Sequence, residues 1–401
     1  MFTFIDNGSV TSVNGIKAAG IFCGIKKKRK DIALIYSEMP CSAAGTFTLN
    51  KVKAAPLLIS QEVIKSNSQI NAVLVNSGVA NACTGEEGIS NAKLMQKECA
   101  EKLSINPENV LISSTGVIGQ QLPMNELLNG INDLVPALSD EGGSDAAEAI
   151  MTTDTKPKSF AVKVESGDSS YTIGGICKGS GMIMPNMATM LAFITTDAKI
   201  ENPLLQKMLS AAVDISFNKI SVDGETSTND MVILLSNGAA EVNIEADSNE
   251  AEIFQQALNA LSIQMAKSII SDGEGATKLI TLNVTGAHSK QDADLVGKSL
   301  SNSSLLKTAI YGEDANWGRI MSSAGMSGAD FDPSKVTIKF DDHFVLMPDY
   351  KIVVDESIAS KILSQNELNI NVNLNGGKYS STWWTCDLTE EYIKINAHYR
   401  T

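Results

Sequence analysis

The sequence predicts a mixed α/β protein built in layers. Short runs rich in β-branched and apolar residues alternate along the chain with longer stretches of helical periodicity. The chain has 401 residues, of which 43% are hydrophobic and 19% charged, which is enough for a large core and for two or three domains. No regular strand–helix–strand repeat is visible, so the order of the strands in a sheet stays open.

The N-terminal part of the chain is predicted to be mainly strand. The strands expected there span residues 16–25, 31–39, 43–49 and 70–78. The basic run Lys26 to Lys30 lies between the first two strands, and we interpret it as a solvated hairpin turn rather than a localisation signal. A helix is expected to begin near Pro56, because proline suits the first turn of a helix.

The middle of the chain is predicted to contain both helices and strands. Asn202 and Pro203 form a typical N-cap and first-turn pair for a helix that runs to about Asn218. A second, long helix is expected to end at Asp272–Gly273, where glycine is a common stop signal. The helices are expected near 86–103, 127–138, 145–151 and 250–270, and the strands near 109–116, 160–166, 171–179 and 191–198. The strand at 109–116 is expected to end in a turn.

Composition argues against several classes of partner. A net charge of −14 disfavours a nucleic-acid partner and an anionic membrane surface. The N-terminus has no basic and apolar leader, and no stretch approaches the roughly 18 apolar residues of a membrane-spanning helix. The six cysteines are scattered without a CxxC pair, which predicts reduced thiols in a cytoplasmic protein. The three histidines have no metal-ligand spacing, and we expect neither a metal nor an organic cofactor.

The most unusual stretch is 174–197, GGICKGSGMIMPNMATMLAFITTD. Its glycines invite a phosphate-loop interpretation, but neither GxxxxGK[ST] nor GxGxxG is present, so nucleotide binding is disfavoured. We interpret its methionines mostly as core packing. A flexible GSG segment and the pair Pro185–Asn186 place Ala188 and Thr189 directly ahead of an apolar strand.

The peptide bond between Ala188 and Thr189 is a candidate for self-cleavage. In a strained turn, a threonine hydroxyl can attack the preceding carbonyl and give an ester that water hydrolyses. The product is an N-terminal threonine whose α-amine, with a pKa of about 8, can act as the base for its own hydroxyl. On the residues alone an inert Ala-Thr pair is the stronger alternative, because such dipeptides are common.

The segment KGSGMIMPNMATMLAFITTDA resembles the signature of the ornithine acetyltransferases, the self-processing glutamate N-acetyltransferases of arginine biosynthesis. The resemblance extends over nearly the whole chain. It is carried in order by SAAGTFT, NSGVANACTG, SSTGVIG, MTTDT, VDGETSTNDM, SDGEGATK, YGEDANWGRI and the terminal CDLTEEYIKINAHYRT. One such motif can arise by chance, but this ordered set is highly specific.

The resemblance implies a fold, a processing event and a reaction. The fold is the layered α-β-β-α architecture of self-processing acyltransferases with an N-terminal nucleophile. Cleavage between Ala188 and Thr189 gives an α-chain of residues 1–188 and a β-chain of residues 189–401, which share one core and associate as a heterotetramer of two α and two β chains. The enzyme transfers acetyl from N2-acetylornithine to glutamate through an acetyl-Thr189 intermediate. Whether acetyl-CoA is also a donor is left open.

The resemblance also names the site. It assigns an oxyanion hole to Thr115 and Gly116. It assigns substrate contacts to Thr152, Lys178, Thr189, Glu274, Asn396 and Thr401. We hypothesise that Lys178 meets a carboxylate and Glu274 the side-chain ammonium of ornithine, while the others supply neutral hydrogen bonds. On the residues alone, an ordinary strand-end turn is the preferred interpretation of Thr115 and Gly116. Each substrate-contact residue is then more often a surface or capping group, and a solvated Glu274 is the simpler interpretation.

Several alternatives stay open. Asp223, Glu225, Asn229 and Asp230 lack the spacing of a calcium loop, and we expect turns and supporting hydrogen bonds there. Trp317 with Arg319 suits a stacking platform, although a buried aromatic with a paired arginine is the simpler interpretation. Val79 and Glu225 depart from the family pattern, which puts fine substrate preference in doubt. The rival functions are a self-processing aminopeptidase or amidohydrolase with the same nucleophile, and an uncleaved ligand-binding protein.

Overall fold

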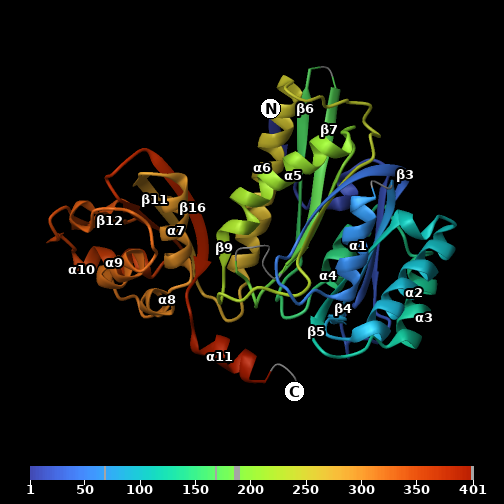
Figure 1. Cartoon of the computed structure of the whole chain (residues 1–401), viewed down its shortest axis with the longest axis horizontal. Coiled ribbons are helices and arrows are strands. Elements are labelled where there is room, and N and C mark those ends of the chain that lie inside the picture. Colours follow the sequence, from blue (N-terminus) through green and yellow to red (C-terminus); the bar gives the residue numbers. More distant parts are fainter. Residues whose placement is uncertain (67–68, 168, 185–189, 399–401) are drawn as a thin grey trace. The chain divides into compact units, whose positions relative to one another are not determined.

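The computed structural model describes residues 1–66, 69–167, 169–184 and 190–398 (Figure 1). They divide into two compact units. Unit 1 takes the described residues of Met1–Gly179, Asn186–Asn218 and Thr226–Ile269, and unit 2 those of Ser180–Pro185, Lys219–Glu225 and Ile270–Thr401. Neither unit is a single continuous segment. Within the described ranges, no helix is long and apolar enough to cross a membrane.

Unit 1 is built on one large sheet. Among the described residues it has nine strands, in the order β1–β6–β7–β8–β10–β3–β4–β5, and β2 pairs with β3 beside this path. The pairs β8–β10 and β4–β5 are parallel, whereas the other neighbours are antiparallel. The strands are β1 (Phe2–Phe4), β2 (Ile16–Ile21), β3 (Ile32–Phe47), β4 (Ile70–Val79), β5 (Val110–Val117), β6 (Lys158–Ser166), β7 (Ser169–Lys178), β8 (Leu191–Thr196) and β10 (Met231–Ser236).

Strand β3 differs from the prediction. Two strands were expected at 31–39 and 43–49, but the structure has one continuous strand of 16 residues. Its first half pairs with β2 and β4, and its second half pairs with β10. Pro40 lies in an irregular stretch of the pairing between Tyr36 and Cys41. A proline is tolerated there because a bulged position does not require a ladder hydrogen bond.

The helices of unit 1 lie close to their predicted positions, with one correction at a helix start. They are α1 (Ala55–Lys65), α2 (Gly85–Leu103), α3 (Met124–Leu134), α4 (Gly143–Ala149), α5 (Asn202–Ile215) and α6 (Asn249–Ser271). Glu201, not Asn202, occupies the N-cap position of α5. The side-chain oxygen of Asn202 instead accepts the backbone N–H of Ala43 at 2.9 Å. α5 ends at Ile215, and a 3₁₀ turn at Phe217–Lys219 follows.

The layers of unit 1 follow from the alternation of side chains along its strands, because successive residues point to opposite faces. Ile35 of β3 packs with Phe193 of β8 in an inner core between two parts of the sheet. Leu34 packs on the other face, in a core shared with α1, α2 and α3 (Figure 1). On the far face of β7, the Tyr171 ring lies 5.8 Å from the ring of Phe254 in α6, measured between centroids. The mixed α/β class and its helix–strand–strand–helix layering are confirmed.

The basic run Lys26 to Lys30 lies in the predicted hairpin connection between β2 and β3, and Lys27, Lys28 and Arg29 are exposed as expected, but Lys26 turns inward. Lys26 is half-buried, and its ammonium donates to the carbonyl oxygen of Met151 at 2.9 Å. The guanidinium of Arg29 donates to the carbonyl oxygen of Asp154 at 3.2 Å. These contacts join segments 125 positions apart, which local periodicity does not reveal. The run therefore packs against the segment after α4.

Unit 2 has its own sheet and its own core. Its described strands follow the order β14–β13–β12–β15–β11–β16–β9, and Trp383 and Phe340 belong to the apolar core beneath its helices. The strands are β9 (Ile220–Ser221), β11 (Leu279–Ala287), β12 (Thr337–Phe340), β13 (His343–Met347), β14 (Lys351–Ile352), β15 (Glu367–Asn373) and β16 (Tyr379–Cys386). The helices are α7 (Lys290–Ser301), α8 (Ser304–Tyr311), α9 (Trp317–Gly325), α10 (Glu356–Leu363) and α11 (Glu390–Ala397).

Candidate active site

The predicted oxyanion residues lie at the end of β5 in unit 1. Thr115 is 5% exposed, and Gly116 has a φ of +132°, outside the region that side chains favour. Gly116 pairs with Gly78 of β4, and a Cβ built on Gly116 would lie 2.2 Å from the carbonyl carbon of Gly78. Only glycine fits this close approach of two backbones. The strand therefore continues through Gly116 to Val117, where the sequence predicted a turn.

A buried amide network holds this end of β5. Ser114 donates its hydroxyl to the Asn76 side-chain oxygen at 2.5 Å, and both residues are fully or almost fully buried. The amide nitrogen of Asn229 donates to the carbonyl oxygen of Ser114 at 2.8 Å and to that of Ala80 at 2.7 Å. Two buried carbonyl groups thus depend on one side chain, which fixes the backbone directly before Thr115.

The next residue, Asp230, holds the start of β8. One oxygen of its carboxyl accepts the backbone N–H of Met190 at 2.9 Å. The carboxyl is completely buried, and within the described residues its second oxygen has no hydrogen-bond partner. Burial raises the pKa of Asp230 well above its usual value, against the opposing hydrogen bond from Met190. Asp230 is thus a buried carboxyl group that contacts Met190, the residue that follows the predicted nucleophile in sequence.

Lys178, the last residue of β7, is the centre of a buried polar cluster in unit 1 and is 2% exposed. Its Nζ donates to the Thr152 hydroxyl at 2.7 Å and lies 3.8 Å from an oxygen of Asp154. Asp154 also accepts from Lys158 Nζ at 2.7 Å and from the Gly179 N–H at 2.8 Å. Burial alone would raise the pKa of Asp154, but the charges of Lys178 and Lys158 hold it well below its usual range.

Unit 2 contains a second pair of predicted site residues. Asn396 of α11 donates its amide N–H to a carboxylate oxygen of Glu274 at 2.7 Å. Glu274 is only 7% exposed, so the simpler interpretation from the sequence, a solvated carboxylate in a loop, is wrong. A Cβ built on Gly181 would lie 2.4 Å from this carboxylate, so the glycine allows its approach. The Glu274 N–H donates to the Ser180 carbonyl at 2.9 Å, which fixes the backbone.

The structure also settles two alternatives. Asp223 forms the expected turn and accepts the backbone N–H groups of Met182 and Ile183 at 2.6 and 2.9 Å, as well as the Tyr392 hydroxyl at 3.2 Å. Trp317 is only half-buried, and the Arg319 guanidinium donates to a backbone carbonyl, so the two do not form the simple buried pair expected.

Comparison with known proteins decides the family. The ArgJ family model matches residues 17–401.

The chain belongs to the ArgJ family.

Relatives in this family match almost end to end. The arginine biosynthesis bifunctional protein ArgJ of Thermotoga neapolitana is 48% identical over 96% of this chain and 99% of its own length. The protein of the same name from Symbiobacterium thermophilum is 47% identical over 98% of this chain and 99% of its own. A solved ArgJ chain from Bacillus halodurans is 46% identical and covers 46% of this chain and 97% of its own, with a TM-score of 0.45. The ArgJ family makes this chain an acyltransferase of arginine biosynthesis, as the resemblance implied.

The predicted site residues of this ArgJ family member fall into three groups. Thr115, Gly116, Thr152 and Lys178 lie in unit 1, and Glu274 and Asn396 lie in unit 2. Ala188, Thr189 and Thr401 lie outside the described residues. Within unit 1 the structure joins Thr152 to Lys178, and within unit 2 it joins Asn396 to Glu274.

Sequence reasoning missed residues that support the predicted ones. Asp154 stands in the quoted motif MTTDT, and its position two residues after Thr152 was the available signal. Asn229 was noted only as part of a polar cluster. Lys26 was assigned to a solvated turn, and no local signal in the sequence distinguishes it from its basic neighbours.

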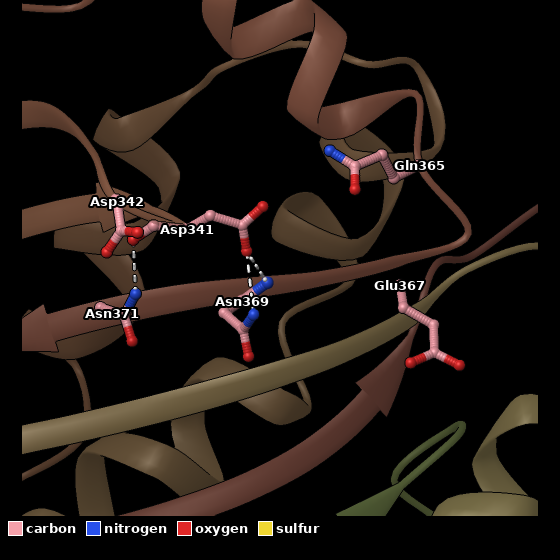
Figure 2. A pocket seen from close by; sticks show the side chains of 6 residues that line it. All are labelled: Asp341, Asp342, Gln365, Glu367, Asn369 and Asn371. Atoms are coloured by element: carbon pink, nitrogen blue, oxygen red, sulfur yellow. Dashed lines mark hydrogen bonds between the residues drawn. The ribbon is translucent and has the colours of Figure 1, made fainter.

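Unit 2 also contains a polar pocket away from the predicted site residues in sequence (Figure 2). It has a volume of about 530 Å³ and is lined by Asp341, Asp342, Gln365, Glu367, Asn369 and Asn371. The Asp341 carboxylate accepts both the backbone and the side-chain N–H of Asn369 at 2.9 Å, so it fastens a turn to β15. In the part of the chain that the structure describes, no three His, Cys, Asp or Glu side chains form a metal-binding group.

Proposed function

We propose that this acyltransferase moves the acetyl group of N2-acetylornithine to glutamate through an ester on Thr189. The observation that carries the proposal is the pair Asn229–Asp230 in unit 1. Asn229 donates to the carbonyl of Ser114, one residue before Thr115, and Asp230 accepts from the N–H of Met190, one residue after Thr189.

This pair supports a common site for the two groups that acyl transfer requires. An oxyanion hole must lie about 3 Å from the carbonyl oxygen that the nucleophile attacks. Two adjacent residues with buried side chains tie the chain next to Thr115 and the chain next to Thr189 to the start of β10. Lys178 is the cross-strand partner of Leu191, which lies two residues after Thr189. The lysine that is predicted to bind the substrate carboxylate is therefore close to the start of β8.

The proposed reaction has two acyl transfers. The α-amine of Thr189 takes the hydroxyl proton as the oxygen attacks the acetyl carbon of N2-acetylornithine. The Thr115 hydroxyl and the Gly116 N–H stabilise the oxyanion, the C–N bond breaks, and ornithine leaves with the proton. The amine of glutamate then attacks the acetyl-Thr189 ester, the C–O bond breaks, and the threonine hydroxyl regains its proton as N-acetylglutamate leaves.

Substrate recognition is proposed to divide by charge. Lys178 meets the α-carboxylate, and Thr152, which already accepts from Lys178, completes its hydrogen bonding. Glu274, held by Asn396, meets the side-chain ammonium of ornithine. Thr401 supplies a further neutral contact. No metal or organic cofactor takes part in this sequence of steps.

The nucleophile is proposed to arise by self-cleavage between Ala188 and Thr189. The hydroxyl of Thr189 attacks the Ala188 carbonyl, the peptide C–N bond breaks, and water hydrolyses the resulting ester. Residues 1–188 and 189–401 then remain together, which is supported by the insertion of β8 and β10 between β7 and β3 in the sheet of unit 1. Two such pairs are proposed to form a heterotetramer.

We propose a cytoplasmic location as well. All six cysteines are unpaired, and four of them are buried. Free thiols in a chain of this size are typical of a reducing compartment.

Intact mass spectrometry with N-terminal sequencing tests the cleavage. We expect fragments of 188 and 213 residues, the second beginning Thr-Met-Leu, in place of one species of 42.6 kDa. Thr189→Ala should stay uncut and transfer no acetyl group, whereas Thr189→Ser should retain some cleavage because it keeps a hydroxyl. Thr285→Ala, an exposed threonine of β11, is the matched control and should be cut and active.

The product distinguishes the proposed transferase from its rival. With N2-acetylornithine and glutamate, we expect N-acetylglutamate and ornithine in equal amounts. Free acetate as the main product would instead identify an amidohydrolase with the same nucleophile. The same assay with acetyl-CoA as the only acetyl donor decides whether the enzyme is bifunctional in that sense. An uncut wild-type chain without either product would leave only a binding function.

A further inference from the structure

Lys26 is held in place by a buried carboxylate. Asp31 is fully buried, and its oxygens accept the backbone N–H groups of Cys23, Gly24 and Lys26 at 2.7, 3.2 and 2.8 Å. Three donated hydrogen bonds to one charged group fix the loop between β2 and β3. The backbone of Lys26 is therefore set by a buried interaction, and its side chain leaves the loop in one direction.

The side chain of Lys26 borders both groups of predicted site residues in unit 1. A Cβ built on Gly78 would lie 3.0 Å from Lys26 Cγ, and Gly78 is the strand partner of Gly116. The ammonium donates to the carbonyl oxygen of Met151, the residue before Thr152. The stem thus lies along the glycine pair that includes the predicted oxyanion residue, and the charge lies one peptide unit from Thr152.

The charges around this point do not balance. Lys26, Arg29, Lys158 and Lys178 gather around one acidic side chain, Asp154. The other carboxylate nearby, Asp31, already accepts backbone N–H groups. Burial, together with the charges of Arg29 and Lys178, lowers the pKa of Lys26 to about 8 against the attraction of Asp31. A cluster with surplus positive charge gains most from an anionic ligand.

The chemistry of the Lys26 head group also suits a ligand. An ammonium has three N–H donors. Within the described residues, the carbonyl oxygen of Met151 is the acceptor that Lys26 Nζ contacts. Two of its three N–H groups can therefore donate to a ligand.

We propose that Lys26 is a second carboxylate-binding residue, which together with Lys178 receives the α-carboxylate of the amino-acid substrate. This inference rests on the proposed function and deepens it, because it makes a free α-carboxylate the recognised feature of both ornithine and glutamate. A single lysine beside a carboxylate neutralises it, but two cations on different strands also fix its orientation. An amino acid whose carboxylate is amidated should therefore be a poor ligand.

Calorimetric titration with L-ornithine and with L-ornithinamide tests the proposal without relying on turnover. Wild-type protein should bind ornithine about 10- to 100-fold more tightly than ornithinamide, the range expected for a charged hydrogen bond. Lys26→Met should lose about 10-fold in affinity for ornithine and little for ornithinamide, because Lys178 still meets the carboxylate. Lys26→Arg should restore most of the preference, and Lys27→Met, an exposed neighbour, should leave it unchanged.

The thermal midpoint separates binding from a role in folding. Because Lys26 is held among other cations, Lys26→Met should keep or raise the midpoint. A lower midpoint with an equal loss for both ligands would make Lys26 a structural residue and overturn the proposal. An unchanged preference in Lys26→Met would also overturn it. If wild-type protein shows the Lys26-dependent preference but transfers no acetyl group, the proposed reaction is wrong and the carboxylate site stands.

Discussion

Asp154→Asn should be among the most destabilising conservative changes in unit 1. Asp154 and Lys158 are 0% and 1% exposed at their side chains, and their charged atoms lie 2.7 Å apart. Removing the carboxylate of such a pair takes away the charge that compensates the buried ammonium, at a cost of about 3–5 kcal/mol. Asp145→Asn is the matched control, because Asp145 pairs with Lys30 at the surface, where the side chains are 54% and 29% exposed. That change should cost about 0–1 kcal/mol.

The choice of probe decides this experiment. All three tryptophans lie in unit 2, so their fluorescence does not report on unit 1. Hydrogen exchange of the β6 and β7 peptides measures the opening of the strands that flank Asp154. Their exchange should rise far more in Asp154→Asn than in Asp145→Asn.

The pH dependence has a definite sign. The pKa of folded Asp154 lies below its unfolded value of about 3.9, so its contribution is present above pH 4 and is lost as pH falls through the folded value. The difference between wild type and Asp154→Asn should be constant from pH 6 to 8 and should shrink only below about pH 4. Equal protection in the two variants, or a difference that grows on acidification, would refute the reasoning.

Three further outcomes are expected. Gly116→Ala should lower acetyl transfer about 100-fold or more, because its Cβ would meet the facing backbone at 2.2 Å. The control Gly325→Ala, in a helix with open space at its Cβ and no positive φ, should keep its rate. Asp230→Asn should raise the thermal midpoint, and this gain should increase from pH 5 to 8. The reason is that the pKa of Asp230 is higher in the folded than in the unfolded state, so the wild type loses stability as pH rises. A gain that does not change with pH would contradict this reasoning. In the wild type, the affinity for ornithine should fall as pH rises through about 8, whereas in Lys26→Arg it should stay higher because arginine keeps its charge. If calorimetry gives the same dependence of affinity on pH in both proteins, Lys26 is not the titrating group.

Local signals in the sequence predicted the six described helices of unit 1 and the regions of seven of its nine described strands, but did not predict the elements of unit 2 individually. Helix α6 was predicted to within a residue or two at each end, because its periodicity is long and a glycine follows it. Two strands were predicted for β3 because proline usually interrupts a strand, and Pro40 lies between them. The structure has one strand, since Pro40 lies at an irregularity in the pairing with β4 that the sequence does not reveal. Asn202 has the residue type of an N-cap, but its side chain serves a distant backbone N–H.

The candidate site shows the same division. The predicted site residues came from motif resemblance, and within the described residues the structure joins Thr152 to Lys178 and Asn396 to Glu274. Asp154, two residues after Thr152, was within reach of local inspection, but Lys26 and Asn229 could not be predicted because each acts over a long separation. Lys26 meets Met151 across 125 positions, and Asn229 meets Ser114 across 115. Neither composition nor periodicity indicates which of five adjacent basic residues turns inward.

The strand order of unit 1 also constrains when cleavage can occur. Strands β8 and β10 lie between β7 and β3, so a chain that ends at residue 188 would leave both neighbours with unpaired edges. Cleavage before folding would make assembly of the two pieces a second-order process that competes with aggregation. A continuous chain brings them together at a fixed, high effective concentration. The proposed self-cleavage therefore belongs after folding, and separately expressed halves should assemble poorly at low concentration.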